Sequence, residues 1–263
     1  MTTDTRTRAH VIWYELMTTD SQAALAFYSA LFGWTGKPTP GVSGPYTILS
    51  AGDVGLGGMM DLPKAALAGG AKPGWLMYLG VSDIDDYTAR VKAAGGQVLM
   101  TPTEIPTVGR FSVVTDPQGA AFIMMTPVSR EPMPVVPDRT PGHVGWRELV
   151  TKDGTAAFEF YRTMFGWEKT GEYDMGAMGT YHLFTTGGAK GASEGGMMSM
   201  APGMPGPAWT YYVNVDALDA AVARAREAGG TIVNEAIQVP TGEWIAHLVD
   251  PQGAMVGLLA PKR

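Results

Sequence analysis

The stretch HVIWYELMTTDSQAALAFYSALFGW, residues 10–34, and its later copy HVGWRELVTKDGTAAFEFYRTMFGW, residues 143–167, decide the fold. Fourteen of the 25 positions are identical when the two are aligned at an offset of 133 residues. The correspondence continues at an offset of 134, where DPQGA occurs at 116–120 and again at 250–254. Chance does not produce such agreement, so the chain is a tandem duplication of a unit of about 130 residues.

Each copy opens with a strand and a helix. Residues 10–17 have the character of a strand, and Asp20 is placed to cap a helix that follows. That helix is amphipathic, because apolar residues recur at i, i+3, i+4 and i+7, namely Ala24, Phe27, Tyr28 and Leu31. YTILSAG and the glycine-rich GLGGMM then read as two shorter strands with a flexible connection, ending near Met60. The predicted order is β-α-β-β, with room for one more strand.

The same order then begins again within the copy. WLMYLGV is a predicted strand, and Asp83 is a predicted N-cap for a helix that carries Ile84, Tyr87 and Val91 on one face and stops at Gly95. Three strands follow, QVLMTPTEIP, RFSVVT and AAFIMM, and the DPQG turn joins the last two in a hairpin. The sequence therefore predicts an α+β fold of four βαβββ modules, two in each copy.

A proline-rich segment separates the two copies. Residues 127–142, PVSREPMPVVPDRTPG, hold five prolines in sixteen positions, which favours an extended, semi-rigid strap over a packed element. We therefore expect a first domain at 1–127, a linker at 128–142 and a second domain at 143–263.

Composition excludes several classes of partner and site. The net charge is −6 and no run of Lys or Arg exceeds two residues, so the sequence predicts neither a nucleic-acid nor a membrane-surface partner. There is no cysteine, which excludes disulfides and thiolate metal sites and fits a reducing, cytoplasmic location. No P-loop, dinucleotide fingerprint or Ser-His-Asp order is present. We expect a monomer or a weak homodimer.

The four modules, the FY pair ahead of LFGW and the DPQG hairpin before the last strand resemble the vicinal oxygen chelate superfamily, the group of glyoxalase I, the bleomycin and fosfomycin resistance proteins and the extradiol dioxygenases. The resemblance covers nearly all of both copies. It implies curved mixed sheets that enclose clefts. It leaves function open, because isomerases, dioxygenases, transferases and pure binding proteins share this scaffold.

The resemblance also implies where metal ligands would lie. Metal-dependent members carry a His or Gln on the first strand, a second His at the start of the fifth strand and a Glu on the last strand. In this chain the corresponding positions hold no metal-binding side chain: Trp13 and Trp146, Trp75-Leu76 and Trp209-Thr210, and Ile123 and Gly257. We therefore predict no bound metal and no organic cofactor.

The first strand offers other groups for binding. If Trp13 faces the cleft, strand alternation sends Glu15 and Met17 to the same side, as it does Trp146 and Glu148 in the second copy. An aromatic wall with one carboxylate suits a partly apolar, cationic or hydroxyl-bearing small molecule. The competing structural interpretation is that Glu accepts backbone hydrogen bonds and Trp fills the space of the absent metal.

The two copies have diverged at several aligned positions. Arg110 corresponds to Trp244, and both are candidate ligand contacts, although an Arg at the start of a strand is more often a surface residue. His182 and His247 correspond to Thr47 and Val113, and we interpret both histidines as single strand residues without a catalytic role. His10 and His143 fall at strand starts, in structural or solvent-facing positions. The glycine- and methionine-rich stretches GGMMDLP at 57–63 and GGAKGASEGGMMSMAPGMPGP at 187–207 are interpreted as flexible loops, with mobile lids as the alternative.

The prediction from sequence is a metal-independent protein that binds a small organic molecule in clefts walled by Trp and Glu, with sequestration as one role. The alternative is a metal-independent isomerase, lyase or hydroxylase-like enzyme that uses Glu15 or Glu148 as general base. A weaker alternative is a metal-dependent lactoylglutathione lyase or dioxygenase with ligands from other positions.

Overall fold

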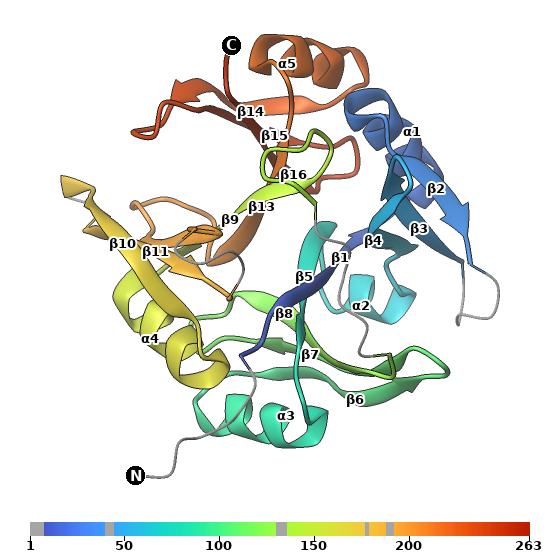
Figure 1. The fold of residues 1–263 in the computed structure, drawn as a ribbon. Coiled ribbons are helices and arrows are strands. Elements are labelled where there is room, and N and C mark those ends of the chain that lie inside the picture. The colour runs from blue at the N-terminus through green and yellow to red at the C-terminus, as the bar shows by residue number, and fades with distance from the viewer. Residues whose placement is uncertain (1–7, 40–44, 130–135, 177–178, 188–191) are drawn as a thin grey trace. The chain divides into compact units, whose positions relative to one another are not determined.

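The computed structural model describes residues 8–39, 45–129, 136–176, 179–187 and 192–263. The four predicted βαβββ modules are confirmed (Figure 1). The elements of the first two are β1 (Val11–Thr18), α1 (Ser21–Phe32), β2 (Thr35–Pro38), β3 (Tyr46–Ala51) and β4 (Val54–Asp61), then β5 (Gly74–Gly80), α3 (Ile84–Ala93), β6 (Val98–Ile105), β7 (Gly109–Thr115) and β8 (Ala121–Pro127). A short helix that the sequence did not predict, α2 (Lys64–Ala68), connects these two modules.

The second half repeats the order. Its third module consists of β9 (Val144–Thr151), α4 (Gly154–Phe165), β10 (Glu168–Asp174), β11 (Thr180–Thr185) and β12 (Gly195–Ser199). The fourth consists of β13 (Ala208–Asn214), α5 (Leu218–Glu227), β14 (Thr231–Gln238), β15 (Trp244–Val249) and β16 (Met255–Ala260). Each half forms one eight-stranded mixed sheet, in the orders β2-β3-β4-β1-β5-β8-β7-β6 and β10-β11-β12-β9-β13-β16-β15-β14.

Local signals position the helices as expected. The Asp20 carboxylate accepts a hydrogen bond from the amide of Ala23, and the buried residues of α1 are the four predicted from the periodicity. Asp83 caps α3 in the same way, and Gly95 after it adopts a left-handed φ of 96°. Both DPQG segments form hairpin turns in which the aspartate side chain accepts backbone amide hydrogen bonds. Among the described residues, no helix is long and apolar enough to cross a bilayer.

The described residues form two compact units that do not coincide with the two sequence copies. We call the unit of Trp13–Leu76, Pro134–Trp146 and Thr210–Arg263 the outer unit, because it contains the first and fourth modules. The unit of Met1–Ile12, Met77–Met133 and Arg147–Trp209 is the inner unit, with the second and third modules. Helices α1 and α5 pack together in the outer unit, as α3 and α4 do in the inner unit.

A buried hydrogen-bond chain joins the two modules of the outer unit. The indole of Trp75 donates to the hydroxyl of Tyr28 at 2.9 Å, and Tyr28 donates to Asp250 at 3.0 Å. Burial, and then the charge of Asp250, raises the pKa of Tyr28 well above its usual value, so the hydroxyl keeps its proton and remains a donor. The FY motif and the DPQG turn therefore serve packing between modules.

The inner unit contains the matching chain. Trp209 donates to Tyr161 at 3.0 Å, and Tyr161 donates to Asp116 at 3.3 Å. Burial raises the pKa of Asp116, against the opposing effect of its backbone amide donors. Trp75 and Trp209 occupy the positions where metal-dependent proteins of the resembling family carry their second ligand. In this structure both indoles instead make hydrogen bonds that join modules.

The prediction of GLGGMM as a strand is confirmed, because it lies in β4, which pairs with β1. The loop interpretation is wrong for residues 57–60 and for residues 195–198, which form part of β12 and pair with β9. Their glycines serve close approach, since a Cβ on Gly57 would lie 2.8 Å from the carbonyl oxygen of Tyr14. Residues 130–135 of the expected strap lie outside the described residues. Its last part is packed, because buried Gly142 accepts a hydrogen bond from the indole of Trp34 at 2.8 Å.

Candidate functional site

The candidate site in the outer unit is built on β1. Along this strand Tyr14, Leu16 and Thr18 are buried at 0–8% exposure on one face. The opposite alternation phase carries Trp13, Glu15 and Met17, with Glu15 buried at 2% and the other two half-buried. The sequence-predicted trio therefore shares one strand face, and a nearly inaccessible carboxylate lies at its centre.

Tyr46 of β3 completes this site. Its hydroxyl donates to Oε2 of Glu15 at 3.0 Å and accepts a hydrogen bond from the indole of Trp13 at 3.1 Å. Burial, and then the neighbouring charge of Glu15, raises the pKa of Tyr46 far above its usual value, whereas the hydrogen bond from Trp13 lowers it. Tyr46 therefore stays protonated and remains the hydrogen-bond donor to Glu15.

Glycine makes room for Tyr46. Gly58 lies opposite Glu15 in the β1–β4 ladder, and a Cβ at Gly58 would lie 1.8 Å from the hydroxyl oxygen of Tyr46. No side chain but hydrogen fits there without displacing the tyrosine. The glycine-rich composition of β4 is thus part of the site.

The inner unit holds a related arrangement. Tyr181 of β11 donates to Glu148 of β9 at 2.9 Å, and a Cβ on Gly196 would lie 2.4 Å from the hydroxyl oxygen of Tyr181. Glu148 is half-buried, in contrast to Glu15. Trp146, the sequence counterpart of Trp13, belongs to the outer unit and is not part of this arrangement. Both copies therefore pair the glutamate of the first strand, β1 or β9, with a tyrosine from another strand of the same module, β3 or β11.

The tyrosines were missed from the sequence, although a signal for them exists. Tyr46 and Tyr181 align at an offset of 135, next to the Thr47 and His182 pair. Each also stands opposite a glycine-rich strand that repeats. An identical aromatic residue retained beside two retained glycines is the pattern that would have pointed to them.

Arg110 and Trp244 lie on the helix-covered faces of their strands. Arg110 shares its alternation phase with fully buried Ser112 and Val114, and its guanidinium makes a two-pronged ion pair with Asp85 of α3 at 2.5 and 3.1 Å. Trp244 shares the phase of Ala246 and Leu248, and Arg263 lies 5.3 Å from its ring centre. In the structure the guanidinium of Arg110 therefore has an exposed carboxylate as its partner.

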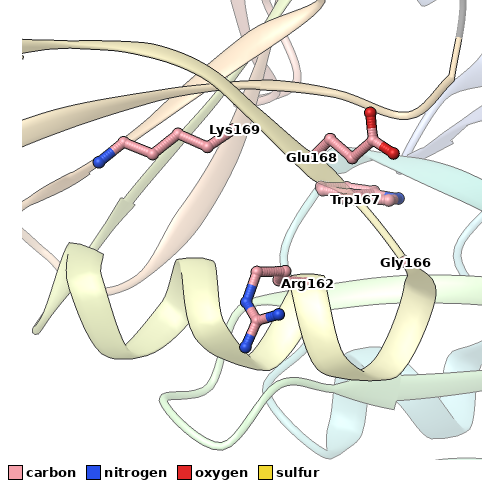
Figure 2. Close-up of a pocket in the computed structure, with 5 residues that line it drawn as sticks. All are labelled: Arg162, Gly166, Trp167, Glu168 and Lys169. Carbon is pink, nitrogen blue, oxygen red and sulfur yellow. The ribbon is translucent and has the colours of Figure 1, made fainter. Parts of the chain in front are cut away.

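A hollow at the end of α4 is a poor alternative site. It is lined by Arg162, Gly166, Trp167, Glu168 and Lys169. Figure 2 shows Glu168 and Lys169 pointing away from Arg162, so the charged groups do not converge. Arg162 pairs with Glu159 at 2.8 Å, and Glu168 pairs with Arg8. Lys169 pairs with Glu172, so ion pairs account for the charged side chains that line the hollow.

The donor set does not fit the divalent metal that the resemblance implies for metal-dependent proteins of this fold. Among the residues that the structure describes, no three His, Asp or Glu side chains gather closely enough to hold an ion. The indoles of Trp13 and Trp75 can only donate, and both donate to tyrosines. We therefore derive no chemistry through a metal.

His182 is buried at 6% exposure between β11 and α4. Its Nε2 lies 2.9 Å from the hydroxyl of Thr155, its ring stacks on Phe158, and its buried Nδ1 makes no hydrogen bond with the described residues. Burial lowers the pKa of His182, as does Lys169, and the carboxylates of Glu172, Asp153 and Glu159 act in the opposite direction. The imidazole is therefore neutral in the folded protein at pH 7.

This burial predicts a loss of stability in weak acid. The folded-state pKa of His182 is lowered, so the unfolded chain binds the extra proton first as the pH falls below about 6.5. The stability is present above that pH and is lost toward the folded-state pKa. Urea midpoints measured from pH 8 to pH 5 should fall more steeply for the wild type than for His182→Gln. Parallel curves for the two proteins would contradict this assignment.

The chain is similar in sequence to known proteins over nearly its whole length. A family model described as the Glyoxalase/Bleomycin resistance protein/Dioxygenase superfamily matches the chain twice, at residues 9–124 and 140–258. The protein named "Putative glyoxylase CFP32" of Mycobacterium tuberculosis is 34% identical over 253 residues, which cover 95% of this chain and 94% of that protein. The anthracycline biosynthesis protein DauV of Streptomyces sp. (strain C5) is 36% identical, over 92% of this chain and 90% of the relative.

Solved structures agree on the fold. The Mn(II)-bound glyoxalase from Novosphingobium aromaticivorans superimposes with a TM-score of 0.63 at 14% identity, over 97% of this chain and 82% of that one. At this level of identity the similarity concerns the fold alone.

Proposed function

The chain belongs to the Glyoxalase/Bleomycin resistance protein/Dioxygenase superfamily, and we propose that it binds a hydroxylated aromatic small molecule through the Trp13–Tyr46–Glu15 site, without a metal. The observation that carries the proposal is the buried Glu15 carboxylate, which accepts the Tyr46 hydroxyl on a strand face shared with Trp13 and Met17. A carboxylate in such surroundings binds a ligand hydroxyl strongly, because hydrogen bonds to charged groups exceed neutral ones.

The aromatic part of the ligand rests on two supports. The half-buried indole of Trp13 offers a flat apolar surface of the kind that stacks on aromatic rings. The relatives DauV and DnrV are named for anthracycline biosynthesis and match at 36% and 35% identity. Anthracyclines are fused aromatic ring systems that carry hydroxyl groups, which suits an indole beside a carboxylate. The Glu148–Tyr181 pair is the corresponding group of the inner unit.

The test uses 1,4-dihydroxyanthraquinone as the probe and tryptophan fluorescence as the signal. Glu15→Gln keeps the size of the side chain and an acceptor for Tyr46, but removes the charge. We expect the affinity to fall about tenfold, or about 1.4 kcal/mol, and a smaller loss for Glu148→Gln because that carboxylate is less buried. Glu227→Gln, an exposed change on α5, is the matched control. Equal affinities for wild type and Glu15→Gln would refute the proposed site.

The enzymatic alternative makes a different demand. A general base at Glu15 or Glu148 would exchange a carbon-bound proton of the ligand with solvent. If a deuterium label on carbon is retained in a bound enolisable probe while Glu15→Gln still weakens binding, the site binds the probe without catalysing proton transfer. Loss of the label to solvent would support the enzymatic alternative.

A further inference from the structure

A second polar group lies on the fourth module. Nε2 of His247 on β15 lies 2.6 Å from the hydroxyl of Tyr212 on β13. Nδ1 of the same ring lies 3.1 Å from the side-chain amide nitrogen of Asn234 on β14. Both ring nitrogens are therefore held, so the ring is fixed in orientation. The expectation that His247 is a single strand residue does not describe it.

The group leads from the core to the surface. Tyr212 is 2% exposed, His247 is half-buried and Asn234 is exposed. Ala246 and Leu248, the strand neighbours of His247, are fully buried on the other face. The Nδ1 edge of His247, beside Asn234, is thus the edge that a ligand from solvent reaches first.

The first copy lacks every element of this group except the tyrosine. At an offset of 134, Tyr212, His247 and Asn234 correspond to Tyr78, Val113 and Met100. The backbone register is the same, since Asn234 pairs with His247 and Met100 pairs with Val113. The fold therefore does not require polar side chains at these positions, because the other copy builds the same strands with apolar ones.

Gly257 accommodates the tyrosine. It pairs with Tyr212 in the β13–β16 ladder and with His247 in the β15–β16 ladder. A Cβ at Gly257 would lie 2.4 Å from the Tyr212 ring. The first copy has Ile123 at this position. Glycine thus allows the Tyr212 ring to lie directly over the backbone, beside the imidazole.

The hydrogen bonds determine the tautomer. With the amide nitrogen of Asn234 donating to Nδ1, the proton of the neutral ring is on Nε2, which donates to the Tyr212 oxygen. Nδ1 then carries the basic lone pair on the accessible edge. A side chain fixed at one nitrogen and basic at the other is the arrangement of a general base oriented by a second group.

We propose that His247 is an acid–base residue of a ligand site on the fourth module, with Tyr212 and Asn234 as its positioning residues. The ligand class is a small molecule with an acidic hydroxyl, such as a phenol. Nδ1 takes the proton as the ligand O–H bond breaks and an N–H bond forms, which leaves an imidazolium and a ligand oxyanion. The Asn234 amide, released from Nδ1, donates to that oxyanion, while Nε2–H stays on Tyr212. The reverse transfer restores the phenol.

Two measurements test this site, and neither depends on the glutamate sites. The chain has four histidines, so two-bond ¹H–¹⁵N spectra can assign the tautomer of His247. We expect protonated Nε2 and bare Nδ1 in the wild type, and a tautomer mixture in Tyr212→Phe. With 4-nitrophenol as the probe, the bound phenolate-to-phenol ratio at slightly acidic pH should exceed that of the free probe about tenfold, equal to one pKa unit.

The variants are chosen from the duplication. His247→Val copies Val113 of the first copy and should abolish the increase in bound phenolate, with His247→Gln as a second variant that retains polarity. His10→Gln, which removes an exposed imidazole elsewhere, should leave the ratio unchanged. A proton on Nδ1 in the wild type, or equal phenolate ratios for the wild type and both His247 variants, would overturn the proposal.

Discussion

Replacing Tyr28 by phenylalanine is expected to lower the free energy of unfolding by about 2–5 kcal/mol. The hydroxyl of Tyr28 accepts from Trp75 and donates to Asp250, and all three residues are at most 8% exposed. Its removal leaves a buried indole N–H and a buried carboxylate oxygen each short of a partner. An unsatisfied buried group costs about 1–3 kcal/mol, and more when it is charged.

The duplication supplies a matched variant. Tyr161→Phe removes the same pair of bonds in the inner unit, where the bond to Asp116 is longer, 3.3 Å against 3.0 Å. We expect a smaller loss there. Tyr173→Phe, at a tyrosine that is 38% exposed, is the control and should change stability by less than about 0.5 kcal/mol. Equal free energies of unfolding in urea for Tyr28→Phe and Tyr173→Phe would exclude a stabilising role for the Trp75–Tyr28–Asp250 hydrogen bonds.

Gly58→Ala is expected to abolish ligand binding by the outer unit. The added methyl would lie 1.8 Å from the Tyr46 hydroxyl oxygen and 2.3 Å from its ring carbon, so the ring must leave its place. Its hydrogen bonds with Trp13 and Glu15 break together. We expect the affinity for 1,4-dihydroxyanthraquinone to fall by more than tenfold, together with a stability loss of about 1–3 kcal/mol from the altered surroundings of Glu15.

The control for this change is another strand glycine. A Cβ on Gly74 of β5 meets no atom within 4 Å, so Gly74→Ala tests the glycine-to-alanine change without the clash. Gly74→Ala should retain both affinity and stability. Wild-type affinity in folded Gly58→Ala would show that the position of Tyr46 is irrelevant to binding and would remove the tyrosine from the site.

Local patterns could be predicted from the sequence because their causes are local. The buried face of α1 follows from the 3.6-residue period, and its start follows from the Asp20 cap. The DPQG turn was predicted for the same reason. Its aspartate, however, also binds the tyrosine of a module more than 40 residues away in the inner unit and more than 220 away in the outer unit. No local pattern indicates such a partner.

The candidate site was predicted in part. Strand alternation predicted that Trp13 and Glu15 share one face of the strand. In the structure both lie on one face of β1, and Glu15 is buried. The strand formed by GLGGMM was predicted, but the reason for its glycine was not: Gly58 is required by the ring of Tyr46, which lies against it. The partner of Arg110 could not be predicted, because its position at the start of β7 does not indicate which helix residue faces the guanidinium. Its ion pair with Asp85 depends on the packing of α3.

The outer unit consists of segments from both ends of the chain, and this has a consequence for its folding during synthesis on the ribosome. When translation reaches residue 209 the whole inner unit has been made, but the first module still lacks its packing partner, since Thr210–Arg263 follow last. Until then the partner of Tyr28 at Asp250 does not exist. Contacts between residues this distant in sequence form late, and until they form the first module exposes apolar surface. The first module is therefore expected to wait longest among the four modules for the partner that covers its apolar surface.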